Sequence, residues 1–102
     1  MIWTPSLGGK DWNLASSTCA GLYPVGRLPT VDELKNAHGL WNANRYWTET
    51  WGGFSAPNYY WAGNLWGDPR YAFDIKFNNG YYDQRGDPVE LQFITRCVKS
   101  EY

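Results

Sequence analysis

The chain has 102 residues, 19% of them charged, and a formal net charge of −1. This length suits one domain spanning residues 1–102. The near-neutral charge is untypical of proteins that bind nucleic acids through a basic surface or membranes through a polybasic segment. No segment reaches the roughly 20 apolar residues that cross a bilayer, so we expect no membrane insertion.

Aromatic residues also make up 19% of the chain, with seven Trp and eight Tyr. Aromatic side chains bury large areas, and Tyr and Trp also carry a polar group that suits a contact surface. Tyr and Trp are enriched among the residues that dominate binding energy. So many aromatic residues therefore indicate a binding surface in addition to an aromatic core.

The N-terminal segment predicts a strand and then a helix. Residues 2–5 are the expected strand, and Asp11 is a typical helix N-cap. Trp12, Ala15 and Cys19 follow at spacings of three and four, so they share one helical face. Cys19 is therefore expected on the buried side of the first helix.

The second helix begins with a capping box. Thr30 and Glu33 are spaced so that each side chain satisfies a backbone N–H of the other residue. We expect the helix to end at His38-Gly39, with Gly39 in the left-handed conformation and His38 on the surface.

From residue 46 onward the pattern is typical of strands. In residues 71–77 the aromatic and aliphatic side chains alternate with Ala72, Asp74 and Lys76, which predicts that Asp74 lies on a solvated face. Helices followed by antiparallel strands indicate an α+β domain. The expected strands are 46–51, 71–77, 81–85 and 89–98, with tight turns at 78–80 and 86–88.

The two cysteines, Cys19 and Cys97, lie near opposite ends of the chain. Their separation is neither a metal-ligand spacing nor a redox motif. They are either two buried free thiols or a disulfide, and their positions on two predicted buried faces favour the disulfide. A bond closing so long a loop would stabilise the domain by roughly 4–5 kcal/mol and would imply an oxidising compartment.

Residues 52–69 are predicted to form a long loop, because glycines and prolines interrupt every regular pattern there. Five aromatic residues in this segment make it the expected ligand-binding surface. In the alternative, Trp51, Trp61 and Trp66 fold back into a small second core. The candidate ligand-binding residues are Trp51, Asn58, Tyr59, Tyr60, Trp61, Trp66, Asp68 and Arg70.

Catalytic patterns are not found in the sequence. His38 is the single histidine, no G-x-S-x-G motif accompanies it, and one histidine with two distant cysteines builds no zinc site. We therefore expect neither an enzyme nor a bound cofactor.

Several segments together resemble one bacterial family. They are a helix holding Cys19, Gly-Arg-Leu-Pro-Thr-Val-Asp-Glu-Leu-Lys at 26–35, Tyr-Trp-Thr-Glu-Thr at 46–50, Phe-Asn-Asn-Gly-Tyr at 77–81 and Arg-Cys-Val at 96–98. The chain resembles the collagen-like-adhesin C-terminal domain family, a branch of the C-type-lectin-like superfamily. It is also similar to the C-terminal domain of intimin- and invasin-type adhesins.

The resemblance implies a C-type-lectin-like fold with two helices, an antiparallel sheet and both termini in one sheet. It implies a Cys19–Cys97 disulfide and a long loop at 52–69. It further implies a bacterial cell-surface module, preceded by an immunoglobulin-like domain in a longer parent chain that carries the export signal. Members of the family act by binding host receptor proteins, glycans or glycosaminoglycans.

The chain departs from the calcium-dependent lectins of this superfamily. It has Ala56-Pro57-Asn58 and Trp66-Gly67-Asp68 where those lectins carry fuller carboxylate motifs. Calcium usually needs six to eight oxygen ligands, and here only Asp68, Glu49 and Asp74 offer carboxylates. We therefore expect no metal site.

Three functions remain open at this stage. The first is adhesion to a host cell-surface receptor protein through the 52–69 loop. The second is a calcium-independent lectin or glycosaminoglycan-binding domain, for which Arg45, Arg70 and Arg85 would have to converge. The third is a structural cap on a stalk of repeated domains.

Overall fold

The computed structural model describes residues 2–43, 54–55, 57–79 and 81–100. Within these ranges the chain forms two helices and two sheets, which confirms the α+β class. The helices are α1 (Trp12–Ala20) and α2 (Val31–Ala43). The strands are β1 (Ile2–Trp3), β2 (Gly9–Lys10), β3 (Gly26–Arg27), β4 (Tyr59–Trp66), β5 (Asp68–Phe77), β6 (Tyr82–Pro88), β7 (Phe93–Ile94) and β8 (Val98–Lys99).

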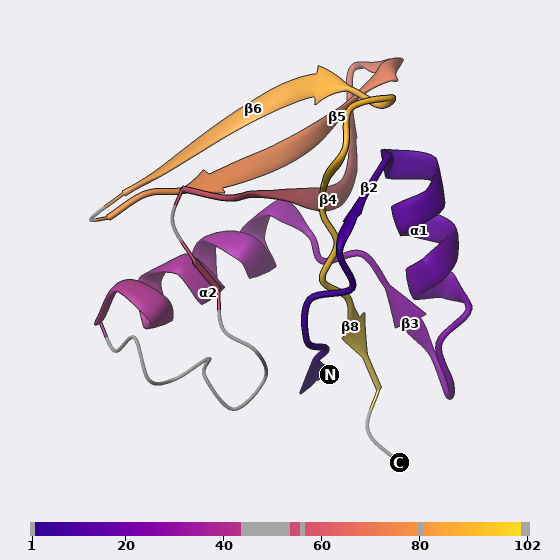
Figure 1. The fold of residues 1–102 in the computed structure, drawn as a ribbon, viewed down its shortest axis with the longest axis horizontal. Coiled ribbons are helices and arrows are strands. Elements are labelled where there is room, and N and C mark those ends of the chain that lie inside the picture. Colours follow the sequence, from indigo (N-terminus) through magenta and orange to yellow (C-terminus); the bar gives the residue numbers. More distant parts are fainter. Residues whose placement is uncertain (1, 44–53, 56, 80, 101–102) are drawn as a thin grey trace.

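The two sheets divide the molecule into a large and a small part. The described residues of the large sheet run in the order β2-β7-β4-β5-β6, and those of the small sheet in the order β1-β8-β3. In Figure 1 the long strands β4, β5 and β6 form one layer with α2 below it, and α1 lies beside β2. Because β1 pairs with β8, the two ends of the chain meet in the small sheet, as expected.

Two apolar clusters lie on opposite faces of β4. Tyr60 and Ala62 face α2, whereas Trp61 faces the side of α1, because successive strand residues point to opposite faces. The first cluster contains Leu34, Ala37, Trp41, Phe54, Tyr60, Ala62, Ile75 and Phe77. The second contains Ala15, Cys19, Leu28, Trp61, Ala72 and Cys97.

A disulfide joins Cys19 in α1 to Cys97, 78 positions later, and its Cα atoms are 5.5 Å apart. Both residues are fully buried in the second cluster. The prediction of a disulfide is confirmed, and the alternative of two free thiols is wrong. The bond ties α1 to the segment between β7 and β8.

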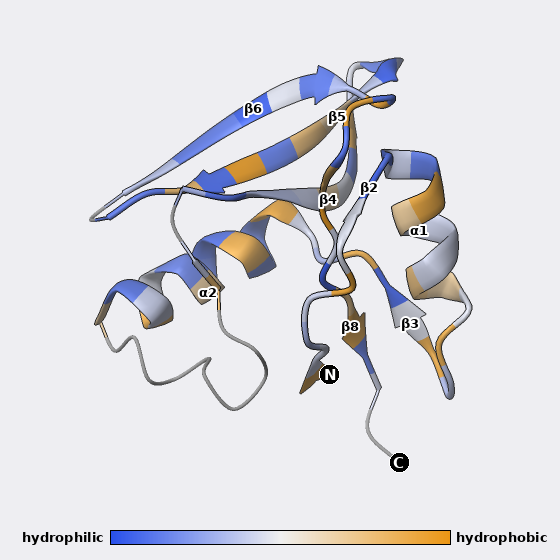
Figure 2. Cartoon of the chain, viewed as in Figure 1, coloured by the Kyte–Doolittle hydropathy of each residue, from blue (hydrophilic) through white to orange (hydrophobic). Residues whose placement is uncertain are grey.

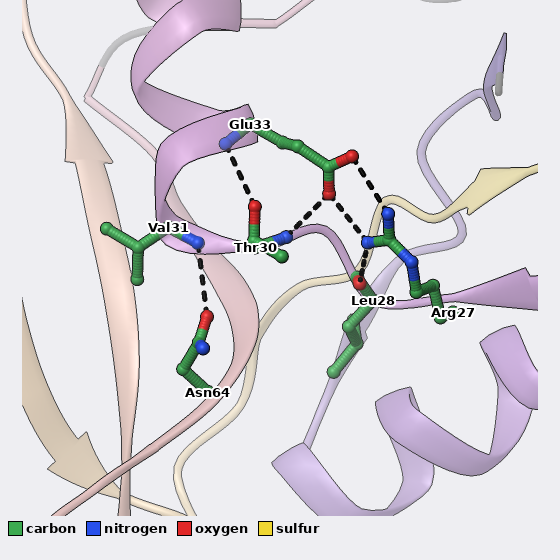
Figure 3. Close-up of polar contacts among 6 residues, drawn as sticks. All are labelled: Arg27, Leu28, Thr30, Val31, Glu33 and Asn64. Carbon is green, nitrogen blue, oxygen red and sulfur yellow. Dashed lines mark hydrogen bonds and ion pairs between the residues drawn. The ribbon is translucent and has the colours of Figure 1, made fainter.

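The start of α2 confirms the predicted capping box and extends it (Figure 3). The Glu33 N–H donates to Thr30 Oγ1 (3.1 Å), and the Thr30 N–H donates to Glu33 Oε1 (2.8 Å). Arg27 of β3 binds both oxygens of Glu33, and Asn64 of β4 accepts a hydrogen bond from the Val31 N–H. The helix start is thereby connected to both sheets.

The start of α1 is also as predicted. The Leu14 N–H donates to Asp11 Oδ1 at 2.8 Å, which confirms Asp11 as the N-cap. Ala15 and Cys19 are buried, and the Trp12 indole N–H donates to the Ala62 carbonyl at 2.8 Å. The buried face of α1 therefore rests on β4.

The predicted end of α2 is wrong. The helix continues through Gly39 to Ala43, because Trp41 extends the apolar face that contacts Phe77. This contact outweighs the roughly 1 kcal/mol that a helical glycine costs. His38 is buried rather than on the surface: its ring contacts Trp41, Phe77 and Tyr82.

The hairpin between β5 and β6 is confirmed, since Phe77 pairs with Tyr82. The turn predicted at 86–88 is wrong, because Gly86 and Asp87 pair with β5 and the strand runs to Pro88. The single strand predicted at 89–98 is divided into β7 and β8, which belong to different sheets. The strand predicted at 46–51 lies outside the described residues.

The strand β6 is one edge of the large sheet. Figure 2 shows that it is mostly hydrophilic, whereas apolar residues appear on β5 and on α2. Polar edge strands discourage pairing with other chains.

Candidate functional site

The prediction of a long loop at 52–69 is wrong for the residues from Tyr59 onward. They form β4 and the start of β5, which join at Gly67, a glycine with φ +64°. The pairing of these strands shifts register between Trp61 and Leu65. The unpaired residues of β4 therefore form a bulge-like irregularity within the hairpin. Glycines and a proline that looked like loop signals are accommodated by this irregular hairpin.

Two of the candidate ligand-binding residues belong to the core. Tyr60 is 2% exposed and Trp61 is fully buried, so neither side chain is available to a ligand. The Trp61 indole N–H donates to the Lys10 carbonyl at 2.8 Å, and its ring packs on Phe93. For Trp61 the alternative of a folded-back core residue is confirmed, whereas Trp51 lies outside the described residues.

Trp66, by contrast, is 49% exposed at the end of β4. Its indole lies against Gly86 of β6, where an added Cβ would come within 2.7 Å of Trp66 Cγ. The rings of Tyr71 and Phe73 meet it edge-on, with centroids 6.1 and 6.5 Å away. Glycine at position 86 is therefore what allows the indole to lie on the strand with its remaining surface open to solvent.

An ion pair lies on the same hairpin, in the first residues of β5. Arg70 Nη2 is 2.8 Å from Asp68 Oδ2, and the Arg70 backbone N–H donates to Asp68 Oδ1 at 2.9 Å. The hydrogen bond from the Arg70 side chain holds the pKa of Asp68 below its ordinary value. The Arg70 side chain is 80% exposed, so its guanidinium stays accessible while its orientation is fixed.

The structure thus brings together three of the predicted residues, Trp66, Asp68 and Arg70, and adds Tyr71. We call these four residues the hairpin tip. Tyr71 was predicted only as a strand residue, and nothing in the alternation distinguishes it from Phe73 or Ile75. Its position beside Trp66 depends on the pairing of β4 with β5.

Asn58 and Tyr59 lie at the opposite end of β4, roughly 20 Å from Trp66 at the usual rise of a strand. The Tyr59 ring stacks on Phe93 with centroids 4.9 Å apart, and the Arg85 guanidinium lies 4.8 Å from the Tyr59 centroid. Asn58 and Tyr59 line a shallow pocket of about 180 Å³. These two residues are therefore not part of the hairpin tip.

Asp74 departs most clearly from expectation. Instead of lying on a solvated face it is fully buried, opposite Trp61 of β4 and Arg85 of β6. Asp68 and Asp74 are six residues apart on one strand, or roughly 20 Å, so they cannot serve one ion or act as a catalytic pair. Glu49 lies outside the described residues.

Across the described ranges, no group of three or more His, Cys, Asp or Glu side chains is gathered as a metal site requires. In the same ranges no helix is long and apolar enough to cross a membrane. The buried His38 packs against three aromatic rings, and its Nε2 lies 3.3 Å from the Asn78 carbonyl oxygen. The exposed surface at the hairpin tip is therefore the strongest candidate site.

The comparisons with known proteins identify no family for this chain. No protein-family model matches it, and no curated protein shows significant similarity to it.

Proposed function

We propose that this chain is an extracellular binding domain of C-type-lectin-like fold from a bacterial surface adhesin, and that the hairpin tip binds a receptor protein on a host cell. The observation that carries the proposal is Trp66, which is half exposed at the end of β4 and held against Gly86, on the hairpin that also carries the exposed Arg70. Trp, Tyr and Arg dominate the energetic centres of protein interfaces.

The tip also has the rigidity that favours binding. Trp66 is held by the Gly86 backbone and two aromatic edges, and Arg70 is held by Asp68. Side chains that are already ordered lose less conformational entropy when a partner binds. A small surface of this kind can therefore anchor a larger contact.

Other features support the proposed location and fold. A disulfide is typical of proteins in oxidising compartments outside the cytosol. The family resemblance implies three features that this chain has: two helices, chain ends that pair in one sheet, and a disulfide from the first helix to the C-terminal segment. Binding rather than catalysis fits a molecule whose exposed site offers an aromatic ring and an ion pair.

Replacing Trp66 with Ala is expected to weaken binding to host cells at least about 30-fold, the effect of losing a residue worth about 2 kcal/mol. The matched control is Tyr81→Ala, which removes an aromatic residue that is 61% exposed at the other end of β5 and β6. The measurement is the affinity of the purified domain for intact host cells. Equal affinities of the two variants would contradict the assignment of the tip.

A second variant tests the geometry of the tip without removing any exposed side chain. Gly86→Ala places a methyl group where the Trp66 indole lies and must displace the ring. Binding is expected to weaken, although Trp66, Asp68 and Arg70 are all retained. Unchanged binding of a folded Gly86→Ala domain would show that the position of the indole does not matter.

A calcium-independent lectin is the second candidate, and the same indole favours it. An open aromatic face can stack on the C–H groups of a sugar ring, while Asp68 and Arg70 bind hydroxyl groups. A glycosaminoglycan is less favoured, because Arg70 and Arg85 each bind their own aspartate rather than forming a joint basic patch. Arg45 lies outside the described residues.

Cell binding under three treatments separates these candidates. Binding that survives a calcium chelator and glycosidase but is lost after protease treatment of the cells supports a protein receptor. Loss with glycosidase alone supports the calcium-independent lectin, and loss with chelator contradicts both candidates. A domain that binds no cells would instead favour a structural cap that packs against a preceding immunoglobulin-like domain.

A further inference from the structure

Asp74 is a buried acid in the middle of a regular strand. Its side chain has no solvent exposure, and neither carboxyl oxygen has a hydrogen-bond partner among the described residues. Bulk solvent therefore does not reach this carboxyl group. Burying an ionised carboxylate without partners is costly, so the neutral acid is the favoured form.

One cation serves two carboxyl groups here. Arg85 Nε is 2.6 Å from Asp87 Oδ2 but 4.0 Å from Asp74 Oδ2. Arg85 also donates from Nη2 to Asp87 Oδ1 at 3.3 Å. The guanidinium is therefore engaged mainly by Asp87 and leaves Asp74 only weakly compensated.

The neighbouring strands supply the other charged and titratable groups near Asp74. On β4 the facing residues are Trp61, which is apolar, and Tyr59, whose ring is covered by Arg85. Lys76 of β5 and Asp83 of β6 share this face, and Lys76 Nζ lies 5.4 Å from the centroid of the Tyr59 ring. Arg85 and Asp87 are thus the groups that act most directly on Asp74.

We propose that Asp74, Arg85 and Asp87 form a pH-sensitive latch between β5 and β6. While Asp74 carries a proton, Arg85 binds Asp87 and covers Tyr59, and the edge strand is closed. When the proton is lost, a second negative charge lies near Arg85, which is already engaged by Asp87 and compensates it only weakly. The buried charge on Asp74 then favours solvation, and the β5–β6 edge loosens to let solvent reach it.

The pKa of Asp74 is consistent with this arrangement. Burial, followed by the neighbouring negative charge of Asp87, raises the pKa of Asp74 from 3.8 to about 8, although Arg85 acts in the opposite direction. Between these two values the folded state holds a proton that the unfolded state has released. Stability therefore falls as pH rises, by up to tenfold in the folding equilibrium per pH unit, and is constant again above about pH 8.

The decisive measurement is a carbon-13 NMR titration of the Asp74 carboxyl in the wild-type domain. A midpoint near pH 8 is expected, and a midpoint near the ordinary value of 3.8 would overturn the proposal. In Asp87→Asn the midpoint should move down, because a neighbouring negative charge is removed. An unchanged midpoint in that variant would contradict the role of Asp87.

Unfolding equilibria give an independent readout. From about pH 5 to about pH 8 the wild-type domain should lose stability relative to Asp74→Asn, which cannot ionise. The matched control is Asp83→Asn, which removes an exposed carboxylate from the neighbouring strand β6 and should retain the wild-type slope. Parallel pH profiles for wild type and Asp74→Asn would overturn the latch, and the NMR titration decides the question if that variant does not fold.

Discussion

Removing the disulfide by Cys19→Ser with Cys97→Ser is expected to lower the free energy of unfolding by about 4–5 kcal/mol. The bond closes a segment of 78 positions, so its loss greatly increases the conformational freedom of the unfolded chain. Native domains are stable by only about 5–15 kcal/mol, so the variant should lie close to the limit of folding.

Denaturant unfolding of the oxidised wild type and of the double variant measures this effect. The wild-type domain with its disulfide chemically reduced is the matched control, because it has the same loop freedom without any substitution. The double variant and the reduced wild type should show similar decreases in the free energy of unfolding. A loss below about 1 kcal/mol in either form would contradict the view that the bond restrains the whole chain.

Trp61→Ala is expected to destabilise the domain by about 3–5 kcal/mol, the usual cost of truncating a large buried aromatic residue. Trp61 is fully buried against Phe93, and its indole N–H would no longer satisfy the Lys10 carbonyl. Trp66→Ala, five positions along the same strand, is the matched control and should cost about 1 kcal/mol or less because Trp66 is half exposed.

Thermal and denaturant unfolding of the two variants test this contrast. The binding measurement should give the opposite order, since Trp66 and not Trp61 is exposed to a partner. A Trp61→Ala domain that is as stable as Trp66→Ala would show that the division of this strand into core and surface is wrong. A folded Trp61→Ala domain that has lost binding would show that the core positions the tip.

The disulfide and Trp61 belong to the same part of the core. Cys19, Cys97 and Trp61 lie in the same buried cluster, on the face of β4 toward α1. The same strand ends at Trp66, so the cluster holds the strand that presents the hairpin tip. Weakening the cluster is therefore expected to affect binding through stability, whereas substitutions at the tip affect binding directly.

Features that depend on neighbouring residues could be predicted from the sequence. The caps at Asp11 and Thr30 need only side chains within three positions of a helix start, and both were confirmed. The hairpin after Phe77 needs only a turn that Asn and Gly adopt readily. The α+β class and the pairing of Cys19 with Cys97 followed from element order and from periodicity.

Features that depend on contacts between distant segments could not be predicted in this way. Trp61 and Trp66 look alike in the sequence, and their odd spacing only predicts opposite faces of β4. That Trp61 faces a buried cluster while Trp66 stays half exposed depends on what packs on each face. Asp74 has the spacing of a surface residue, yet the strands and segments around it bury it. Local spacing determines which face a side chain takes, whereas the elements that pack on that face determine whether it meets water, and this was decided only by the tertiary structure.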